Sequence, residues 1–129
     1  MHMALKIGQP FFQVHIDPMD GTCVMAEYRV RTIRGGKVTA IQYMPGITWV
    51  KLSTKSGDYG WDKSIAPVFR KTWPETDSCE DQGLFTTRSK AWRAAQKRMK
   101  GERFRSWFED GMAEKADRTI KRMLAQAKG

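Results

Sequence analysis

The sequence is poor in the residues that build metal sites and disulfide frameworks. Its 129 residues contain two cysteines and two histidines. Cys23 and Cys79 stand far apart, with no CxxC pattern and no cysteine and histidine cluster, which argues against a zinc site and against a disulfide framework. We therefore expect two reduced thiols and no bound metal.

The chain also lacks long apolar runs. No run approaches the roughly 18 to 20 residues that cross a bilayer. The first residues show no charged and then apolar leader before a cleavage site, so we expect a cytoplasmic protein without a membrane partner. Residues 1–3 read as a cloning remnant and a start methionine, which leaves His15 as the histidine to consider.

Signatures of catalysis are missing as well. There is no P-loop, GxGxxG, GxSxG or HExxH pattern. His15 has no serine, cysteine or acid partner at a recognisable spacing, and the acids between residues 75 and 81 lack the ligand positions of a calcium loop. We expect a protein that is not an enzyme, with no catalytic residues and no cofactor.

Positive charge is abundant and unevenly placed. The formal net charge is +9, of which residues 88–129 carry +8, from 13 Lys and Arg against 5 Asp and Glu. Between Arg88 and Arg105 eight cations stand against the single acid Glu102. Such a block favours an anionic partner, which can be nucleic acid, a membrane surface or an acidic protein.

Alternating apolar and polar residues predict a body of short strands. Adjacent glycines at 35 and 36 predict a tight hairpin, and residues 73–83 read as an acidic surface loop. In the second strand Val24, Ala26, Tyr28 and Val30 share one expected face. The expected strands are Pro10–Ile16, Thr22–Ile33, Val38–Met44, Ile47–Ser53 and Ser64–Arg70. Five short strands favour an antiparallel barrel or sandwich, with Tyr28, Trp49, Phe69, Phe85 and Trp92 in the core.

Three helical segments follow. Thr86 and Thr87 are good N-caps for a helix that begins near Arg88, and Gly101 is expected to end it. A second segment holds Phe104, Trp107 and Phe108, and a third runs from Met112 to Ala127 after a break at residues 110–111. We predict an α+β chain with a β-body and packed basic helix over residues 4–100 and a separable helical extension over residues 101–129.

Two features of the sequence resemble a known family. They are the Gly-Gly hairpin and the short apolar strand that runs into a capped helix, from Leu84 to Trp92. Residues 10 to 95 resemble small SH3-like barrel proteins found among the accessory genes of bacteriophages and other mobile elements. The resemblance implies a five-stranded antiparallel SH3-like barrel followed by helices. It transfers no functional residue, because one fold serves many functions.

The basic helix is the main candidate site. Lys90, Arg93, Lys97 and Lys100 fall within an arc of about 80° opposite the stripe of Ala91, Trp92, Ala95 and Met99. Like charges at these spacings cost an isolated helix about 0.2 to 0.5 kcal/mol per pair, so helix stability alone does not favour them. The alternative is an ordinary solvated face. We favour a non-catalytic module whose basic helix contacts the phosphates of DNA or RNA.

Weaker candidates accompany this helix. Arg29 and Arg31 are possible secondary phosphate contacts on a strand, with a plain solvent-facing strand as the alternative. Tyr59 and Trp61 can stack on bases, or can cap an open barrel end. The sequence does not distinguish DNA from RNA, or single from double strands, as the bound form.

The second hypothesis is a different class of protein. Phe104, Trp107 and Phe108 interleave with Arg103 and Arg105, a composition typical of interface hot spots. The chain would then be an adaptor, or a phage-encoded inhibitor of a host protein, or would form a homodimer through its C-terminal helices. Docking of the three aromatic side chains on the chain's own body is the simpler alternative.

Overall fold

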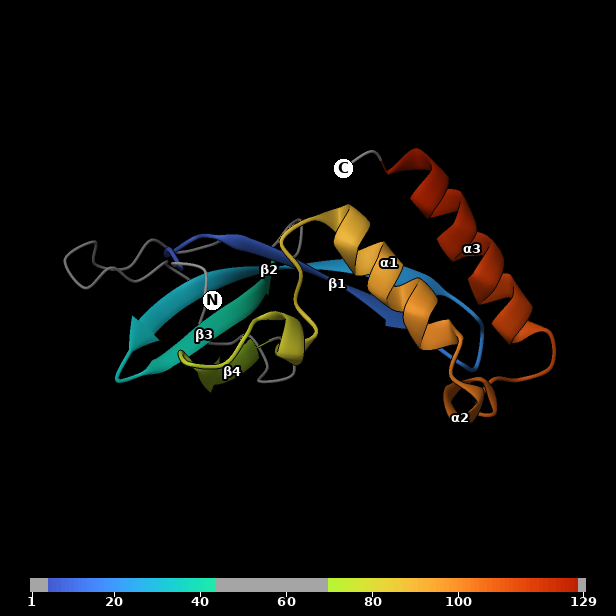
Figure 1. Ribbon diagram of the computed structural model, residues 1–129, viewed down its shortest axis with the longest axis horizontal. Coiled ribbons are helices and arrows are strands. Elements are labelled where there is room, and N and C mark those ends of the chain that lie inside the picture. The colour runs from blue at the N-terminus through green and yellow to red at the C-terminus, as the bar shows by residue number, and fades with distance from the viewer. Residues whose placement is uncertain (1–4, 44–69, 128–129) are drawn as a thin grey trace. The chain divides into compact units, whose positions relative to one another are not determined.

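The protein is an α+β chain, as the sequence predicts. The computed structural model describes residues 5–43 and 70–127. Within these ranges four antiparallel strands pair in the order β1-β2-β3-β4, and helices follow the last strand (Figure 1). The elements are β1 (Pro10–Ile16), β2 (Cys23–Arg34), β3 (Lys37–Tyr43), β4 (Arg70–Pro74), the 3-10 helix η3 (Glu80–Gln82), α1 (Arg88–Met99), α2 (Glu102–Arg105) and α3 (Met112–Gln126).

The hairpin between β2 and β3 forms at the predicted glycines. Gly35 and Gly36 both have positive φ, 56° and 75°, the left-handed conformation that a two-residue hairpin turn requires and that glycine adopts without strain. Arg34 pairs with Lys37 directly across this turn, so the first three predicted strands are confirmed. The strand predicted at Ile47–Ser53 and most of that at Ser64–Arg70 lie outside the described residues.

The start of the predicted acidic loop is wrong. Trp73 and Pro74 belong to β4, and Trp73 pairs with Val38 of β3 and is 1% exposed. The four acids that follow Trp73 led to the prediction of a loop. Burial of the Trp73 indole nevertheless stabilises a strand at this position, because removing so large an apolar surface from water is favourable. From Glu75 onward the prediction holds, because Glu75, Asp77, Glu80 and Asp81 are all exposed.

The chain forms two compact units that are not contiguous in sequence. Unit 1 comprises Met1–Phe11 and Glu27–Leu84, and unit 2 comprises Phe12–Ala26 and Phe85–Gly129. Instead of a boundary at residue 100, this division groups α1 with the later helices. Among the described side chains of unit 1, the buried ones include Phe11, Tyr28, Val30, Val38, Ala40, Ile41, Trp73 and Leu84.

Unit 2 packs its two longer helices against a strand pair. Helices α1 and α3 lie side by side (Figure 1), and α3 contributes Ala116 and Ile120 to the same core as Trp92 of α1. The backbones of Phe12 and Phe85 pair through two hydrogen bonds of 2.7 and 2.9 Å. The buried cluster is Phe12, Val14, Ala91, Trp92, Ala95, Met99, Ala113, Ala116 and Ile120, so the stripe predicted on α1 is confirmed.

Burial along β2 does not follow one face throughout. Val24 shares the predicted face of Ala26, Tyr28 and Val30 but is 59% exposed, whereas Cys23 and Met25 of the other face pack against the core of unit 2. Further along the same strand Ala26, Tyr28 and Val30 are buried as predicted. Both faces of β2 are therefore covered, at different positions, and strict alternation cannot identify such a strand's exposed residues.

The helix ends agree with the sequence in part. The predicted second segment is shorter than expected, because α2 ends at Arg105 and leaves Trp107 and Phe108 beyond it. The Thr87 hydroxyl accepts a hydrogen bond of 3.1 Å from the backbone N–H of Lys90, as an N-cap does. Gly111, with φ of 79°, separates α2 from α3 at the predicted break. Gly101 is not the C-cap of α1: Lys100 takes that position, and Gly101 has φ of −76° and begins α2 directly.

Candidate anion-binding surface

Helix α1 has one buried face and one cationic face. Ala91, Trp92, Ala95 and Met99 are buried in unit 2, so the helical repeat turns the remaining side chains outward. The side chains of Arg88, Lys90, Arg93, Lys97, Arg98 and Lys100 are all exposed. No acidic residue lies in the first turn of α1 to balance Arg88 and Lys90 against the helix dipole.

The four predicted contact residues keep their charges uncompensated. Within residues 5–43 and 70–127, Lys90, Arg93, Lys97 and Lys100 form no ion pair with an acid. Lys90 has the hydroxyl of Thr86 at 3.5 Å from its ammonium nitrogen, which is a neutral partner. The structure therefore brings these four residues together on one face, as the sequence predicts.

Two other cations of α1 also contribute to packing. The Arg98 guanidinium lies 4.1 Å from the ring centroid of Phe104, and that of Arg88 lies 4.7 Å from the ring centroid of Phe12. At such distances a cation is attracted to the negative face of the ring. Both arginines thus cover an aromatic side chain of unit 2 while keeping their charges at the surface.

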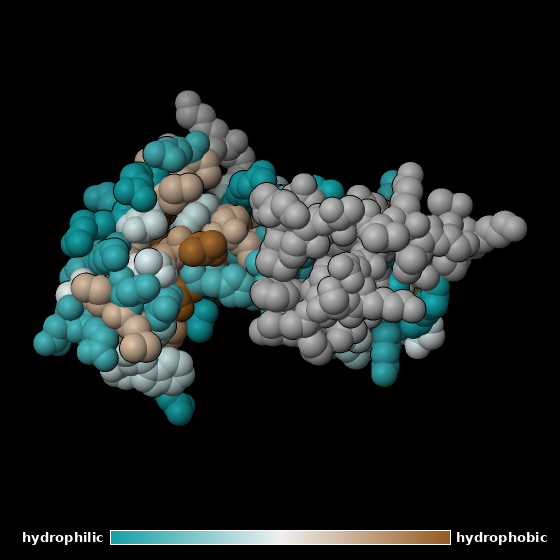
Figure 2. Space-filling model, turned by 180° about the vertical axis from the view of Figure 1, so that it is seen from behind, coloured by the Kyte–Doolittle hydropathy of each residue, from teal (hydrophilic) through white to brown (hydrophobic). Residues whose placement is uncertain are grey.

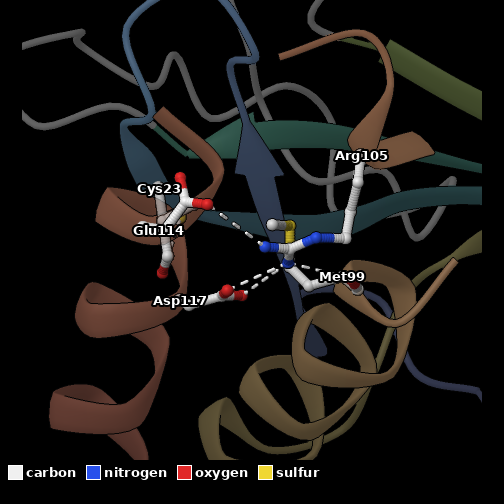
Figure 3. A network of polar contacts seen from close by, with 6 residues as sticks. Cys23, Met99, Arg105, Glu114 and Asp117 are labelled. Atoms are coloured by element: carbon white, nitrogen blue, oxygen red, sulfur yellow. Dashed lines mark hydrogen bonds and ion pairs between the residues drawn. The ribbon is translucent and has the colours of Figure 1, made fainter. Parts of the chain in front are cut away.

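Arg105 holds the acids of α3, an arrangement that spacing in the sequence did not reveal (Figure 3). Its Nη1 donates to both carboxylate oxygens of Asp117, at 2.9 and 3.2 Å, and to the carbonyl oxygen of Met99 at 3.2 Å. Its Nη2 lies 4.0 Å from Oε1 of Glu114. A single guanidinium of α2 thereby joins the end of α1 to α3.

This pairing gives α3 a net cationic outer face. Glu114 and Asp117 are the acids of α3, and both lie beside Arg105. The cations of α3 are exposed: Lys115, Arg118, Lys121 and Arg122. Lys100 of α1 and Lys121 of α3 border one open hollow of about 550 Å³, floored by Met99 and Ile120. The sequence did not indicate that Lys121 lies beside the end of α1, because this depends on how α1 and α3 pack.

The two arginines predicted as phosphate contacts on β2 are less exposed than the cations of α1. Arg29 donates from Nε to Oε2 of Glu27 at 2.7 Å, and the two side chains are 30% and 18% exposed. Arg31 is likewise half-buried. These arginines belong to unit 1, whereas the basic helix belongs to unit 2. Tyr59 and Trp61 lie outside the described residues, as do Trp49 and Phe69.

The predicted aromatic partner site is divided by the fold. Phe104 and Phe108 are half-buried, pack against the core of unit 2 and meet edge to face, with ring centroids 5.1 Å apart. Trp107 is 60% exposed. In the view of Figure 2, the coloured part of the surface is mostly hydrophilic, with a few hydrophobic side chains among the hydrophilic ones. Of the three residues, only Trp107 offers most of its ring to a partner.

The cysteines are not placed for nucleophilic or metal chemistry. Both are free thiols and half-buried, and the Cys23 thiol donates to the carbonyl oxygen of Ala116 at 3.9 Å. Burial raises the pKa of both thiols, and the nearby carboxylate of Asp117 adds to the increase for Cys23. In the described part of the chain, no three His, Cys, Asp or Glu residues gather to hold a metal ion.

Comparison with known proteins does not indicate a function. No family model, curated protein or solved structure matches this chain. Among the described helices, none combines the length and the apolar character that a membrane span needs. The exposed cations of α1 are the feature of the described residues that points to an anionic partner.

Proposed function

We propose that this protein is a non-catalytic module that binds nucleic acid through its backbone phosphates, on the outer face of α1. One observation carries the proposal. Lys90, Arg93, Lys97 and Lys100 stand together on the exposed face of a helix whose other face is buried, without an acidic partner in the described residues. Phosphates supply the charge that this face lacks, and release of their counterions favours binding.

The composition of the face supports nucleic acid over an acidic protein. Apart from Gln96, the exposed side chains of α1 are Lys and Arg, and no exposed aromatic or aliphatic residue stands among them. Protein interfaces are usually anchored by buried apolar or aromatic hot spots, whereas phosphate contacts need only positive charge and donors. Lys121 of α3 adds a further cation across the hollow beside Lys100, and the Arg105 and Asp117 side chains also line that hollow.

Salt dependence tests the proposal. If the four residues each neutralise one duplex phosphate, the slope of log affinity against log salt is about −3.6. The double variant Arg93→Gln and Lys97→Gln should make that slope shallower by about 2, on unrelated sequences alike, because phosphate contacts do not read bases. Fluorescence anisotropy of labelled duplexes from 50 to 200 mM salt is the measurement.

A matched control separates local contacts from net charge. Lys6 and Lys37 are exposed cations of unit 1, so Lys6→Gln with Lys37→Gln changes the net charge equally. The slope should change far less in this control. Equal changes in both double variants would mean diffuse attraction without a site, and no wild-type binding at 50 mM salt would overturn the function.

A protein adaptor is the second candidate, supported by the exposed ring of Trp107. Phe104 and Phe108 support it less, because they pack within unit 2. Size-exclusion mass with and without nucleic acid distinguishes the two, since an adaptor that self-associates does so at high salt and alone.

We also propose that the strands form an SH3-like barrel. The antiparallel order β1-β2-β3-β4 and the Gly35-Gly36 hairpin support an SH3-like barrel. The strand predicted at Ile47–Ser53, which such a barrel would include, falls outside the described residues.

A further inference from the structure

Trp107 is an exposed ring on a firmly packed support. Its indole is 60% exposed, and it meets the ring of Phe104 edge to face with centroids 5.9 Å apart. Phe104 in turn meets Phe108 at 5.1 Å, and both phenylalanines pack against the core of unit 2. The indole is therefore presented to solvent by aromatic neighbours that are themselves held in place.

The backbone around Trp107 is fixed on both sides. The N–H of Trp107 donates to the carbonyl oxygen of Phe104, and the N–H of Phe108 to that of Arg105, each at 3.1 Å. The N–H of Glu109 donates to the carbonyl oxygen of Pro18 at 3.0 Å, which ties this turn to the β1–β2 connection. A side chain positioned in this way loses little conformational freedom when a ligand covers it.

The support of Trp107 is shared with the basic helix. Arg98 of α1 lies 4.1 Å from the centroid of Phe104, the same ring that Trp107 touches. Lys97 precedes Arg98 on the cationic face, and Arg103 is exposed on α2. An aromatic ring beside a row of cations is how single-strand binding proteins hold a base while the backbone follows the positive charge.

We propose that Trp107 stacks on an unpaired base of a single-stranded nucleic acid whose phosphates lie along α1. This inference rests on the proposed function and names its substrate class. A base in a duplex is already stacked on both faces and must be extruded at a cost before it can meet an indole, so Trp107 favours single strands. Glu109 and Asp110 follow Trp107 and are exposed, and their negative charges repel phosphates.

Three variants test the stacking. Trp107→Leu removes the π-face, Trp107→Phe keeps a smaller one, and Met19→Gln removes another exposed apolar side chain of unit 2 as the matched control. The probes are labelled oligo-dT of about 12 nucleotides and a duplex of the same length. We expect Trp107→Leu to weaken oligo-dT binding about tenfold and to leave duplex binding unchanged. Trp107→Phe should lose less, and Met19→Gln should bind as the wild type does.

A spectroscopic readout accompanies the affinities. Oligo-dT should quench part of the wild-type tryptophan fluorescence, and that part should be missing in Trp107→Phe. Thermal melts should coincide for all four proteins, because an exposed indole contributes little to stability.

The outcomes separate the two proposals. If the wild type binds neither probe at 50 mM salt, the proposed function falls and this inference with it. If the wild type binds both probes and Trp107→Leu binds them equally well, or loses both equally, stacking is overturned while the phosphate surface stands. If Trp107→Leu changes only the size-exclusion mass of the protein alone, Trp107 is a protein contact and stacking is overturned.

Discussion

Arg105 has more partners than any cation of the basic face. It donates to Asp117 and to the carbonyl oxygen of Met99, and it lies beside Glu114. Arg105→Met keeps the aliphatic stem but leaves these acceptors without a donor. Because the side chains of Arg105 and Asp117 are 32% and 44% exposed, we expect a loss of about 1 to 2 kcal/mol in the free energy of unfolding, measured by urea denaturation.

Arg103→Met is the matched control, since Arg103 is exposed on the same short helix. Its effect should stay within about 0.5 kcal/mol. An equal loss in both variants would mean that the network around Arg105 contributes nothing beyond its charge.

The two cysteines should react slowly in the folded protein. Burial raises the pKa of both thiols, so less of the reactive thiolate is present at any given pH than in the unfolded chain. The sign for stability follows: the unfolded chain loses these protons first, so stability falls as pH rises above about 9. Thiol titration at pH 8 should find two free thiols, both faster in denaturant. An intramolecular bridge found by mass would contradict this.

Helix α1 is the element that the sequence described best. Its amphipathic spacing, its Thr87 cap and its exposed cations all follow from the 3.6-residue repeat, which needs no knowledge of distant residues. The sequence did not predict that Trp73 lies in a strand or that Val24 is exposed, because each depends on which element covers the strand. The pairing of Arg105 with Asp117 was missed for the same reason, since helix α3 supplies the partner.

The N-cap of α1 gives a prediction at this scale. Thr87→Ala removes the acceptor of the Lys90 N–H and should lower the free energy of unfolding by about 1 kcal/mol. Thr86→Ala is the matched control, because among the described residues the Thr86 hydroxyl has only the Lys90 ammonium group as a side-chain partner, at 3.5 Å. Urea denaturation followed by circular dichroism measures both. A larger loss in Thr86→Ala would contradict the assigned cap.

At the scale of the whole molecule, α3 contributes buried side chains to the core of unit 2. Ile120 is 2% exposed and lies in the same buried cluster as Trp92. We expect Ile120→Ala to cost about 2 to 4 kcal/mol, against less than about 0.5 kcal/mol for the exposed neighbour Lys121→Ala. A chain that ends at Gly111 should lose the protected emission of Trp92. Native-like, cooperative unfolding of that shortened chain would show that unit 2 does not need α3.

The interleaving of the two units has a consequence for synthesis on the ribosome. The strand segments of unit 2, residues 12–26, leave the ribosome long before the helices that cover them, which begin at Arg88. At about 5 to 20 residues per second, the completion of α3 follows roughly 5 to 20 s later. Until α1 emerges, Phe12 and Val14 have no helix to cover them, and the nascent chain presents an apolar surface to chaperones. No single cut in the chain yields either unit intact, so a nascent chain completes unit 2 only after its last helix has emerged.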